Sequence, residues 1–241
     1  MIDKKFLQEQ AAKQGFSISD AMAADFDQYA ELLIDWNTRM NLTAITDPVG
    51  IVIKHFMDSL LLLDALQKNA CSFPAAAKLI DVGAGAGFPS VPVRLYRPDL
   101  QITQLDSLQK RVVFLQAVSD QLGLSAQVLH MRAEEGGKHP DLREKFDLAT
   151  ARAVANLREL SEYCLPFVKP GGYFVALKGY DVEEELAQAE AAIRILGGQV
   201  QSVSKYTLSS EARRSIVILQ KISQTPPKYP RIPAKIAKNP L

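Results

Sequence analysis

The chain has 241 residues, of which 47% are hydrophobic and 23% charged, and its formal net charge is +1. This composition suits one folded α/β domain with a modest extension and excludes a chain that is disordered throughout. Two separated cysteines and three histidines indicate neither a disulfide framework nor a metal site, so no metal is expected. Without a leader or an apolar run of roughly 18 residues, we expect a soluble cytoplasmic protein with no membrane contact. The near-neutral charge means that any nucleic-acid contact must come from local patches.

Residues 1–70 are predicted to form a helical region that packs on the rest of the chain. Large apolar side chains recur there at alternating four- and three-residue steps, which places them on one face of a helix of about 20 residues. These side chains are Met22, Phe26, Tyr29, Leu33, Trp36 and Met40. Because large apolar residues are usually buried, the stripe is better explained as core than as a platform for stacking bases.

A second N-terminal helix is predicted to begin with Asp47 as its N-cap and Pro48 in its first turn. It carries His55 and Asp58, which are three residues apart and so neighbours on its surface. The pair has two interpretations, a catalytic imidazole oriented by a carboxylate or a structural pair that docks the helical region. Since no nucleophile lies beside it in the sequence, the structural interpretation is favoured.

Residues 71–223 alternate strand and helix patterns with α/β spacing. The predicted strands are 78–82, 101–106, 126–131, 146–151, 173–178, 199–208 and 215–221, and the predicted helices are 89–96, 108–122, 154–168 and 183–196. The last two strands lack a helix between them, so the final strand should pair antiparallel with its neighbour. The predicted fold is therefore a Rossmann-like, seven-stranded, mostly parallel sheet with one antiparallel edge strand.

The first strand runs directly into Gly83, Gly85, Gly87 and Phe88, at a point where the chain must turn sharply into a helix. The glycine spacing is not that of the dinucleotide fingerprint, which has its third glycine one residue later. With Asp81 before the glycines, the stretch resembles the first motif of S-adenosylmethionine (SAM) dependent methyltransferases, and on that resemblance Gly83, Gly85 and Gly87 are expected to bind the cofactor. Taken alone, it leaves open another nucleotide site or a plain tight turn.

Ligands of such sheets bind at the carboxyl ends of the strands, so the residues that follow each strand are candidates for the site. Asp106 follows the second strand, where an acid accepts hydrogen bonds from ribose hydroxyls, although it equally suits a helix cap. Ala133 and Glu134 follow the third strand and are expected near an adenine. Arg152 follows the fourth strand and is expected to reach the transfer site. Cys164 lies in an apolar helical pattern and is expected in the core.

Several segments, in this order, resemble the small-subunit rRNA guanine-N7 methyltransferases, a family also called glucose-inhibited division protein B. They are residues 41–45, 55–60, 81–89, 132–134, 151–153 and 178–179, followed by 227–231 and 238–241. The resemblance implies methylation of guanine 527 in 16S rRNA, with SAM as methyl donor. It also implies cofactor contacts at Gly83, Phe88, Ala133, Glu134 and Arg152. Because guanine N7 carries a lone pair and no proton, no general base is expected, and Arg152 would act by positioning.

Residues 224–241 form a proline-rich basic tail, in which five prolines argue against a regular helix or a central strand. With 16S rRNA or the small ribosomal subunit as partner, the RNA contacts are expected at Lys178, Lys228, Tyr229, Arg231, Lys235 and Lys238. Two alternatives stay open. One is a methyltransferase for a small metabolite, whose tail only clamps the two halves together. The other is a non-catalytic nucleotide-binding interaction protein of cell division.

Overall fold

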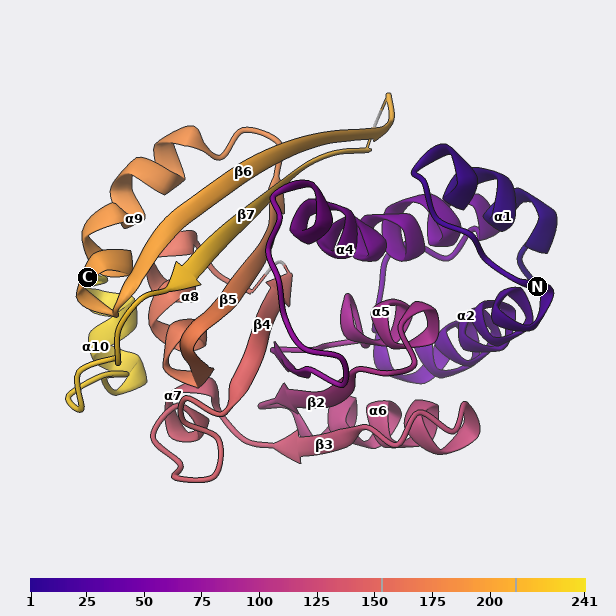
Figure 1. Ribbon diagram of the computed structural model, residues 1–241. Helices are drawn as coiled ribbons and strands as arrows, with labels where there is room; N and C mark the ends of the chain where they lie inside the picture. Colours follow the sequence, from indigo (N-terminus) through magenta and orange to yellow (C-terminus); the bar gives the residue numbers. More distant parts are fainter. Residues whose placement is uncertain (153, 211) are drawn as a thin grey trace.

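The computed structural model describes residues 1–152, 154–210 and 212–241, so Ala153 of the 151–153 segment lies outside the described residues. Seven strands form one sheet in the order β3-β2-β1-β4-β5-β7-β6 (Figure 1). Their bounds are Lys78–Val82 (β1), Gln101–Asp106 (β2), Gln127–His130 (β3), Phe146–Arg152 (β4), Val168–Gly179 (β5), Gly198–Ser209 (β6) and Ala212–Lys221 (β7). Strands β1 to β5 pair in parallel, and β7 is antiparallel to both β5 and β6. The predicted α/β fold is confirmed.

One detail of the topology differs from the prediction, because the antiparallel strand β7 lies one position in from the edge and β6 forms the edge. The physical reason is composition. Ile216, Val217, Ile218 and Leu219 of β7 are fully buried, as a strand covered on both faces requires. In contrast, β6 consists largely of glutamine, serine and threonine with one lysine, which suits an exposed edge.

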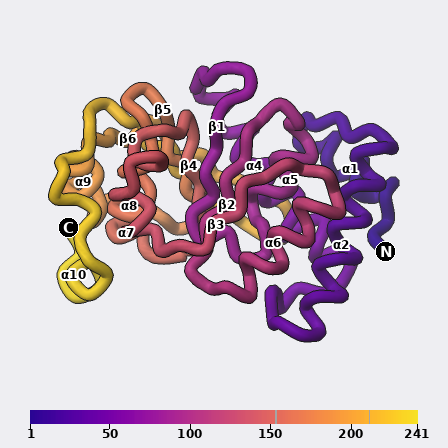
Figure 2. The backbone as a smooth tube through the Cα atoms, turned by 90° about the horizontal axis from the view of Figure 1, so that it is seen from below, coloured from indigo at the N-terminus to yellow at the C-terminus, as the bar shows by residue number. Residues whose placement is uncertain are grey.

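Helices cover both faces of the sheet, and the chain ends lie at opposite sides of the molecule (Figures 1 and 2). One hydrophobic cluster joins the sheet to the N-terminal helices and to two helices that follow β1 and β2. These are α1 (Lys4–Lys13), α2 (Asp20–Met40), α3 (Pro48–Gly50), a π-helix (Ile51–Met57), α4 (Asp58–Lys68), α5 (Ser90–Tyr96) and α6 (Gln109–Gln121). The second cluster includes side chains of α8 (Leu157–Cys164) and α9 (Glu183–Ile195), Cys164 among them. Within the described ranges, no helix is long and apolar enough to span a bilayer.

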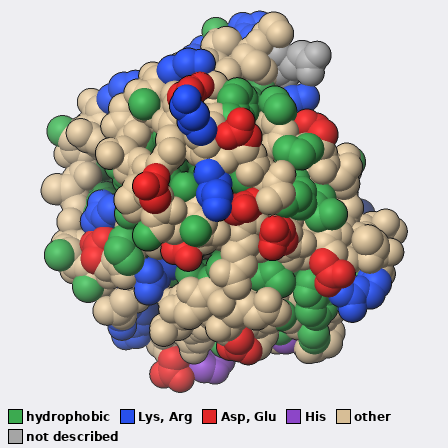
Figure 3. All heavy atoms as spheres, turned by 90° about the vertical axis from the view of Figure 1, so that its right-hand side faces the viewer, with side chains coloured by type: hydrophobic (Ala, Val, Ile, Leu, Met, Phe, Trp, Pro, Cys, Tyr) green, Lys and Arg blue, Asp and Glu red, His purple; other side chains and the backbone are tan. Residues whose placement is uncertain are grey.

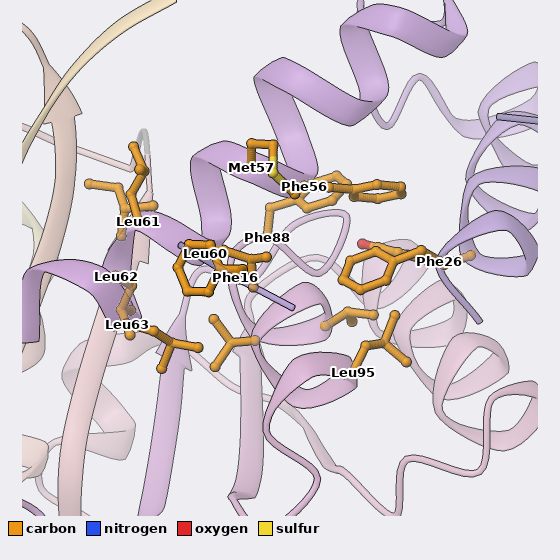
Figure 4. Packing of buried hydrophobic residues seen from close by; sticks show 14 of the residues in the cluster. Phe16, Phe26, Phe56, Met57, Leu60, Leu61, Leu62, Leu63, Phe88 and Leu95 are labelled. Carbon is orange, nitrogen blue, oxygen red and sulfur yellow. The ribbon is translucent and has the colours of Figure 1, made fainter. Parts of the chain in front are cut away.

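The N-terminal helices pack directly against the glycine loop. As predicted, the apolar stripe of α2 faces the core, where Phe26, Tyr29 and Leu33 are fully buried, while its other three members pack against the core and are partly buried. The ring centroids of Phe26 and Phe56 are 5.0 Å apart, and those of Phe56 and Phe88 are 6.3 Å apart (Figure 4). Asp47 caps α3 as predicted, since its carboxylate accepts a hydrogen bond from the Gly50 amide at 2.6 Å.

The C-terminal tail packs beside α8 and α9 (Figure 1), and three expectations for it differ from the structure. First, Tyr229 is buried, so its ring is not available for stacking on an RNA base. Second, residues Pro233–Lys238 form a short helix (α10), because a proline in the first turn removes no helical hydrogen bond. The Arg231 side chain is also engaged, by a two-point ion pair with the buried Glu162. Lys228, Lys235 and Lys238 are exposed.

Candidate active site

The loop after β1 turns back toward the neighbouring strand β2. Gly83 and Gly85 have φ angles of +75° and +60°, a region that side chains with a Cβ rarely adopt. The amides of Gly83 and Ala84 donate to the Leu105 carbonyl at 2.7 and 3.1 Å, which ties the loop to β2. A Cβ built on Gly85 meets only the Gly83 carbonyl, at 3.8 Å, so the space beside this backbone is open. The loop therefore leaves room for a ligand to approach the main chain.

Gly87 serves packing, and its predicted role in cofactor binding is not supported by its position. A Cβ on Gly87 would lie 2.7 Å from Val91 and 2.8 Å from the Tyr29 hydroxyl. That hydroxyl donates a hydrogen bond to the Ala86 carbonyl. Gly87 is thus the point at which helix α2 reaches the glycine loop.

Asp81 fixes the start of α5, the helix that follows the loop. It is fully buried, and its Oδ2 accepts a hydrogen bond from the Ser90 amide at 3.2 Å. Burial raises the pKa of Asp81 to about 6, an effect that the bonds from Ser90 partly oppose.

A cavity of about 360 Å³, here called the donor cavity, lies over the glycine loop. Its lining includes Leu42, Thr43, His55, Gly83, Gly85, Phe88, Asp106, Arg111, Arg152 and Val154. An adjoining cavity of about 260 Å³ shares Gly83, Ser107 and Val154 with it and is lined by Ala133 and Glu134 of the short helix α7 (Ala133–Gly136). The structure therefore brings the residues predicted from the ends of four strands to one edge of the sheet.

This pair of cavities fits SAM. Glu134 is largely buried, and its Oε1 accepts no hydrogen bond from the described residues, although Arg132 Nη1 lies 3.9 Å away as a weak ion-pair partner. A buried acceptor without a donor suits the amino group of an adenine. Asp106, on the donor-cavity side, suits the ribose hydroxyls, and the open backbone at Gly85 suits the methionine end.

The Asp106 carboxylate already holds the loop in place, so both roles weighed for it from the sequence are compatible with its position. Its Oδ1 accepts from the Leu108 amide at the start of α6, and its Oδ2 accepts from the Gly85 amide, both at 2.9 Å. Arg111 Nη1 lies 3.6 Å from Oδ2. An ionised carboxylate has room for about four hydrogen bonds, so acceptor positions are left for a ribose.

Replacing Asp106 with alanine is expected to raise the Kd for SAM roughly 10- to 100-fold, because hydrogen bonds to a charged group contribute about 1.5–3 kcal/mol. Isothermal titration calorimetry measures this directly. Asp99→Ala is the matched control, because Asp99 is an acid just before the opposite end of β2 and pairs with Arg97. An unchanged Kd in a folded Asp106→Ala protein would mean that Asp106 only supports the loop.

Phe88, His55 and Arg152 form a stack at the end of the donor cavity. The rings of His55 and Phe88 are 4.3 Å apart and 19° from parallel, and the Arg152 guanidinium lies 4.7 Å from the Phe88 ring centroid. His55 Nε2 shares a hydrogen bond of 2.8 Å with the Thr43 hydroxyl. Burial, reinforced by the Arg152 charge, lowers the pKa of His55 to about 3. The imidazole is therefore neutral at physiological pH.

A third cavity, of about 370 Å³ and here called the acceptor cavity, meets the donor cavity at His55 and Arg152. It is lined by Ile45, Lys54, His55, Asp58, Arg152, Leu177, Lys178, Gly179 and Arg214. Arg152 thus lies at the junction of the two spaces. Lys178 forms part of the wall, where its amine pairs with Glu185 and donates to the Ala155 carbonyl.

Asp58 and His55 both face Arg152, and Asp58 also pairs with Arg214. The helical region is therefore docked on the sheet as the structural interpretation proposed, but through these arginines and not through a hydrogen bond between His55 and Asp58. Lys54, Arg214 and Thr43 are site residues that the sequence analysis missed. Thr43 lies in the 41–45 segment, which resembles the family but to which no role in the site was assigned from the sequence. The adjacent basic residues Arg213 and Arg214 are a sequence signal, but they give no indication of the cavity that Arg214 lines.

The sequence of this chain matches one family of rRNA methyltransferases over most of its length. A family model described as rRNA small subunit methyltransferase G matches residues 22–217. Ribosomal RNA small subunit methyltransferase G of Alkaliphilus metalliredigens is 44% identical over 243 residues, which cover 100% of each chain. The protein of the same name from Brevibacillus brevis is 46% identical over 242 residues, which cover 99% of each chain.

Solved structures support the fold alone, since their sequences are distant. A precorrin-6y C5,15-methyltransferase from Geobacter metallireducens matches with a TM-score of 0.52 at 17% identity, covering 68% of this chain and 87% of that chain. Family membership is decided by the sequence matches, which extend over nearly the whole chain. With relatives 44% and 46% identical over its full length, the chain belongs to the rRNA small subunit methyltransferase G family.

Proposed function

We propose that this protein transfers a methyl group from SAM to N7 of a guanine in 16S rRNA, the reaction that the resemblance implies. The observation that carries the proposal is the junction of two cavities at Arg152. The glycine loop, Asp106 and Glu134 surround the donor cavity and the cavity that adjoins it, and these two would hold SAM. The acceptor cavity, walled by Lys54, Lys178 and Arg214, would admit the target nucleotide. An rRNA substrate would place the reaction in the cytoplasm.

When bound, SAM supplies a methyl group on a positively charged sulfur, and the guanine N7 lone pair can accept it without losing a proton. The chain's residues would then act by positioning. Arg152 Nη1 donates to the Lys54 carbonyl and to Asp58, both of which line the acceptor cavity, and Nη2 lies 3.4 Å from His55 Nδ1. The remaining N–H of Nη2 would donate a hydrogen bond to guanine O6. Phe88, which is 4% exposed, would exclude water from the junction. Positioning of this kind supplies roughly 7–11 kcal/mol of barrier lowering in favourable cases.

RNA outside the pocket would contact cations near the acceptor cavity, together with the exposed tail residues Lys228, Lys235 and Lys238. The outer face of the N-terminal helices is a poor alternative, because acidic and basic side chains are interspersed on it (Figure 3). A polyanion would be repelled by the carboxylates on that face as often as it is attracted by the cations.

The reaction rate is expected to be flat between about pH 6 and 8.5 in single turnover with saturating SAM and rRNA. His55 has a pKa of about 3, so it is already unprotonated throughout this window and cannot produce a rising limb. Attack from N1 or N2 would require a base, because a proton must leave those atoms. Methyl transfer to RNA with 7-deazaguanine at the target should also fail.

Mass-spectrometric mapping of 16S rRNA from cells with and without this protein tests the proposal as a whole. A single guanine should lose its N7 methyl group in the cells that lack the protein. Unchanged rRNA, with SAM consumed only when a small metabolite is added, would favour the small-molecule alternative. A steep pH limb combined with methylation of the 7-deaza substrate would refute attack by N7.

A further inference from the structure

Asp58 is a buried carboxylate at which two arginines from different strands meet. Its Oδ2 accepts a hydrogen bond from Arg152 Nη1 at 2.9 Å, and Arg214 Nε lies 2.8 Å from its Oδ1 in an ion pair that is not aligned as a hydrogen bond. The Asp58 side chain is only 2% exposed, whereas those of Arg152 and Arg214 are 17% and 29% exposed. Asp58 begins α4, Arg152 ends β4 and Arg214 lies near the start of β7. A single carboxylate of the N-terminal region thus fixes two cations of the sheet.

These three side chains are arranged around one space. All of them line the acceptor cavity, whereas only Arg152 also lines the donor cavity. A guanidinium is a planar fork of donors, and its use in recognition depends on the direction in which the fork is held. An ion pair to a buried, immobile carboxylate fixes that direction before the substrate arrives.

The charges around the acceptor cavity give Asp58 a second effect. Lys54 and Lys178 also line this cavity, and Glu185 pairs with Lys178. Loss of the Asp58 charge would leave the two guanidinium groups as like charges at close range in a partly buried setting, which drives them apart. Methyl transfer moves positive charge from the donor to the base, so a carboxylate in the wall of the acceptor cavity favours that movement.

We propose that Asp58 is a positioning residue of the methyl-transfer site, which orients Arg152 and Arg214 toward the target nucleotide and offsets their charge. The inference deepens the proposed function and rests on it. Asp58 itself need not touch the substrate, because its side chain is only 2% exposed and would act through the two guanidinium groups that it pairs with.

The experiment compares Asp58→Asn, Asp58→Glu, Arg214→Gln and the double variant Asp58→Asn/Arg214→Gln with the wild type. Asp64→Asn is the matched control, since Asp64 is a carboxylate of the same helix that pairs with Lys68. Single-turnover methyl transfer is measured with small ribosomal subunits from cells that lack this protein. Calorimetry gives the SAM affinity, and urea unfolding gives the folded fraction. NMR of the arginine Nε–H groups reports directly whether the side chains are held.

We expect Asp58→Asn to slow transfer about 10²-fold, while the Kd for SAM changes less than about threefold. Asp58→Glu keeps the charge and should recover part of the rate. The double variant should be no more than about threefold slower than Asp58→Asn, because residues that act as one unit are not additive. The chemical shift of the Arg214 Nε–H group should move to the value of a freely mobile, solvent-exposed arginine in Asp58→Asn. It should stay unchanged in Asp64→Asn.

An unmoved Arg214 signal in folded Asp58→Asn overturns the proposal. So does a loss of rate that only follows the unfolded fraction, or an equal loss in Asp64→Asn. Failure of the wild type to methylate the subunits would refute the proposed function instead. In that case the NMR comparison still decides whether Asp58 holds the arginines.

Discussion

Arg152→Ala is expected to slow methyl transfer about 10²- to 10³-fold, the usual cost of losing a preorganised donor at a reacting centre. Arg152 lines both the donor and the acceptor cavity, as His55 does, and its guanidinium is held by Asp58 and stacked on Phe88. Arg152→Lys should recover little of the rate, because an ammonium keeps the charge but has neither the fork nor the flat face.

Single-turnover incorporation of a labelled methyl group into rRNA measures the effect, and urea unfolding checks that the variant is folded. Arg194→Ala is the control, since Arg194 is an exposed arginine on α9 and lines neither of these cavities. A folded Arg152→Ala protein that transfers within threefold of the wild-type rate would remove Arg152 from the proposed site.

Arg231→Ala is expected to lower the free energy of unfolding by about 3 kcal/mol, the lower end of the range for a broken buried ion pair. The Glu162 side chain is 1% exposed, and both of its oxygens accept hydrogen bonds from the Arg231 side chain, at 2.7 to 3.2 Å. The lower end applies because Arg231 itself is 22% exposed and water screens part of the interaction.

The midpoint of urea unfolding at neutral pH measures this change. Lys228→Ala is the matched control from the same tail, and it should change stability by less than about 0.5 kcal/mol because Lys228 is exposed. Adding Glu162→Gln to Arg231→Ala should restore part of the loss by removing the unpaired charge. Equal midpoints for Arg231→Ala and Lys228→Ala would show that the tail is held by its apolar contacts instead.

The sequence alone predicted the elements whose signals are local. The strands 78–82 and 101–106 match the structure residue for residue, because each is a short segment with a turn-forming residue close to one end, glycine directly after the first and proline shortly before the second. The burial of the α2 stripe followed from its period for the same reason. The rule that ligands bind at the carboxyl ends of parallel strands also predicted that Gly83, Asp106, Glu134 and Arg152 lie at one edge of the sheet.

Only the tertiary structure decided which charged and aromatic side chains are buried or paired within the fold and which remain available to a ligand. Tyr229 and Arg231 were predicted to bind RNA because they stand in a basic tail, yet one is buried and the other is paired with Glu162. In the same way, Asp58 meets Arg214 across a long stretch of chain. A sequence lists the charge of each residue but not its partner, because pairing depends on distances that are fixed only when the sheet and helices pack together.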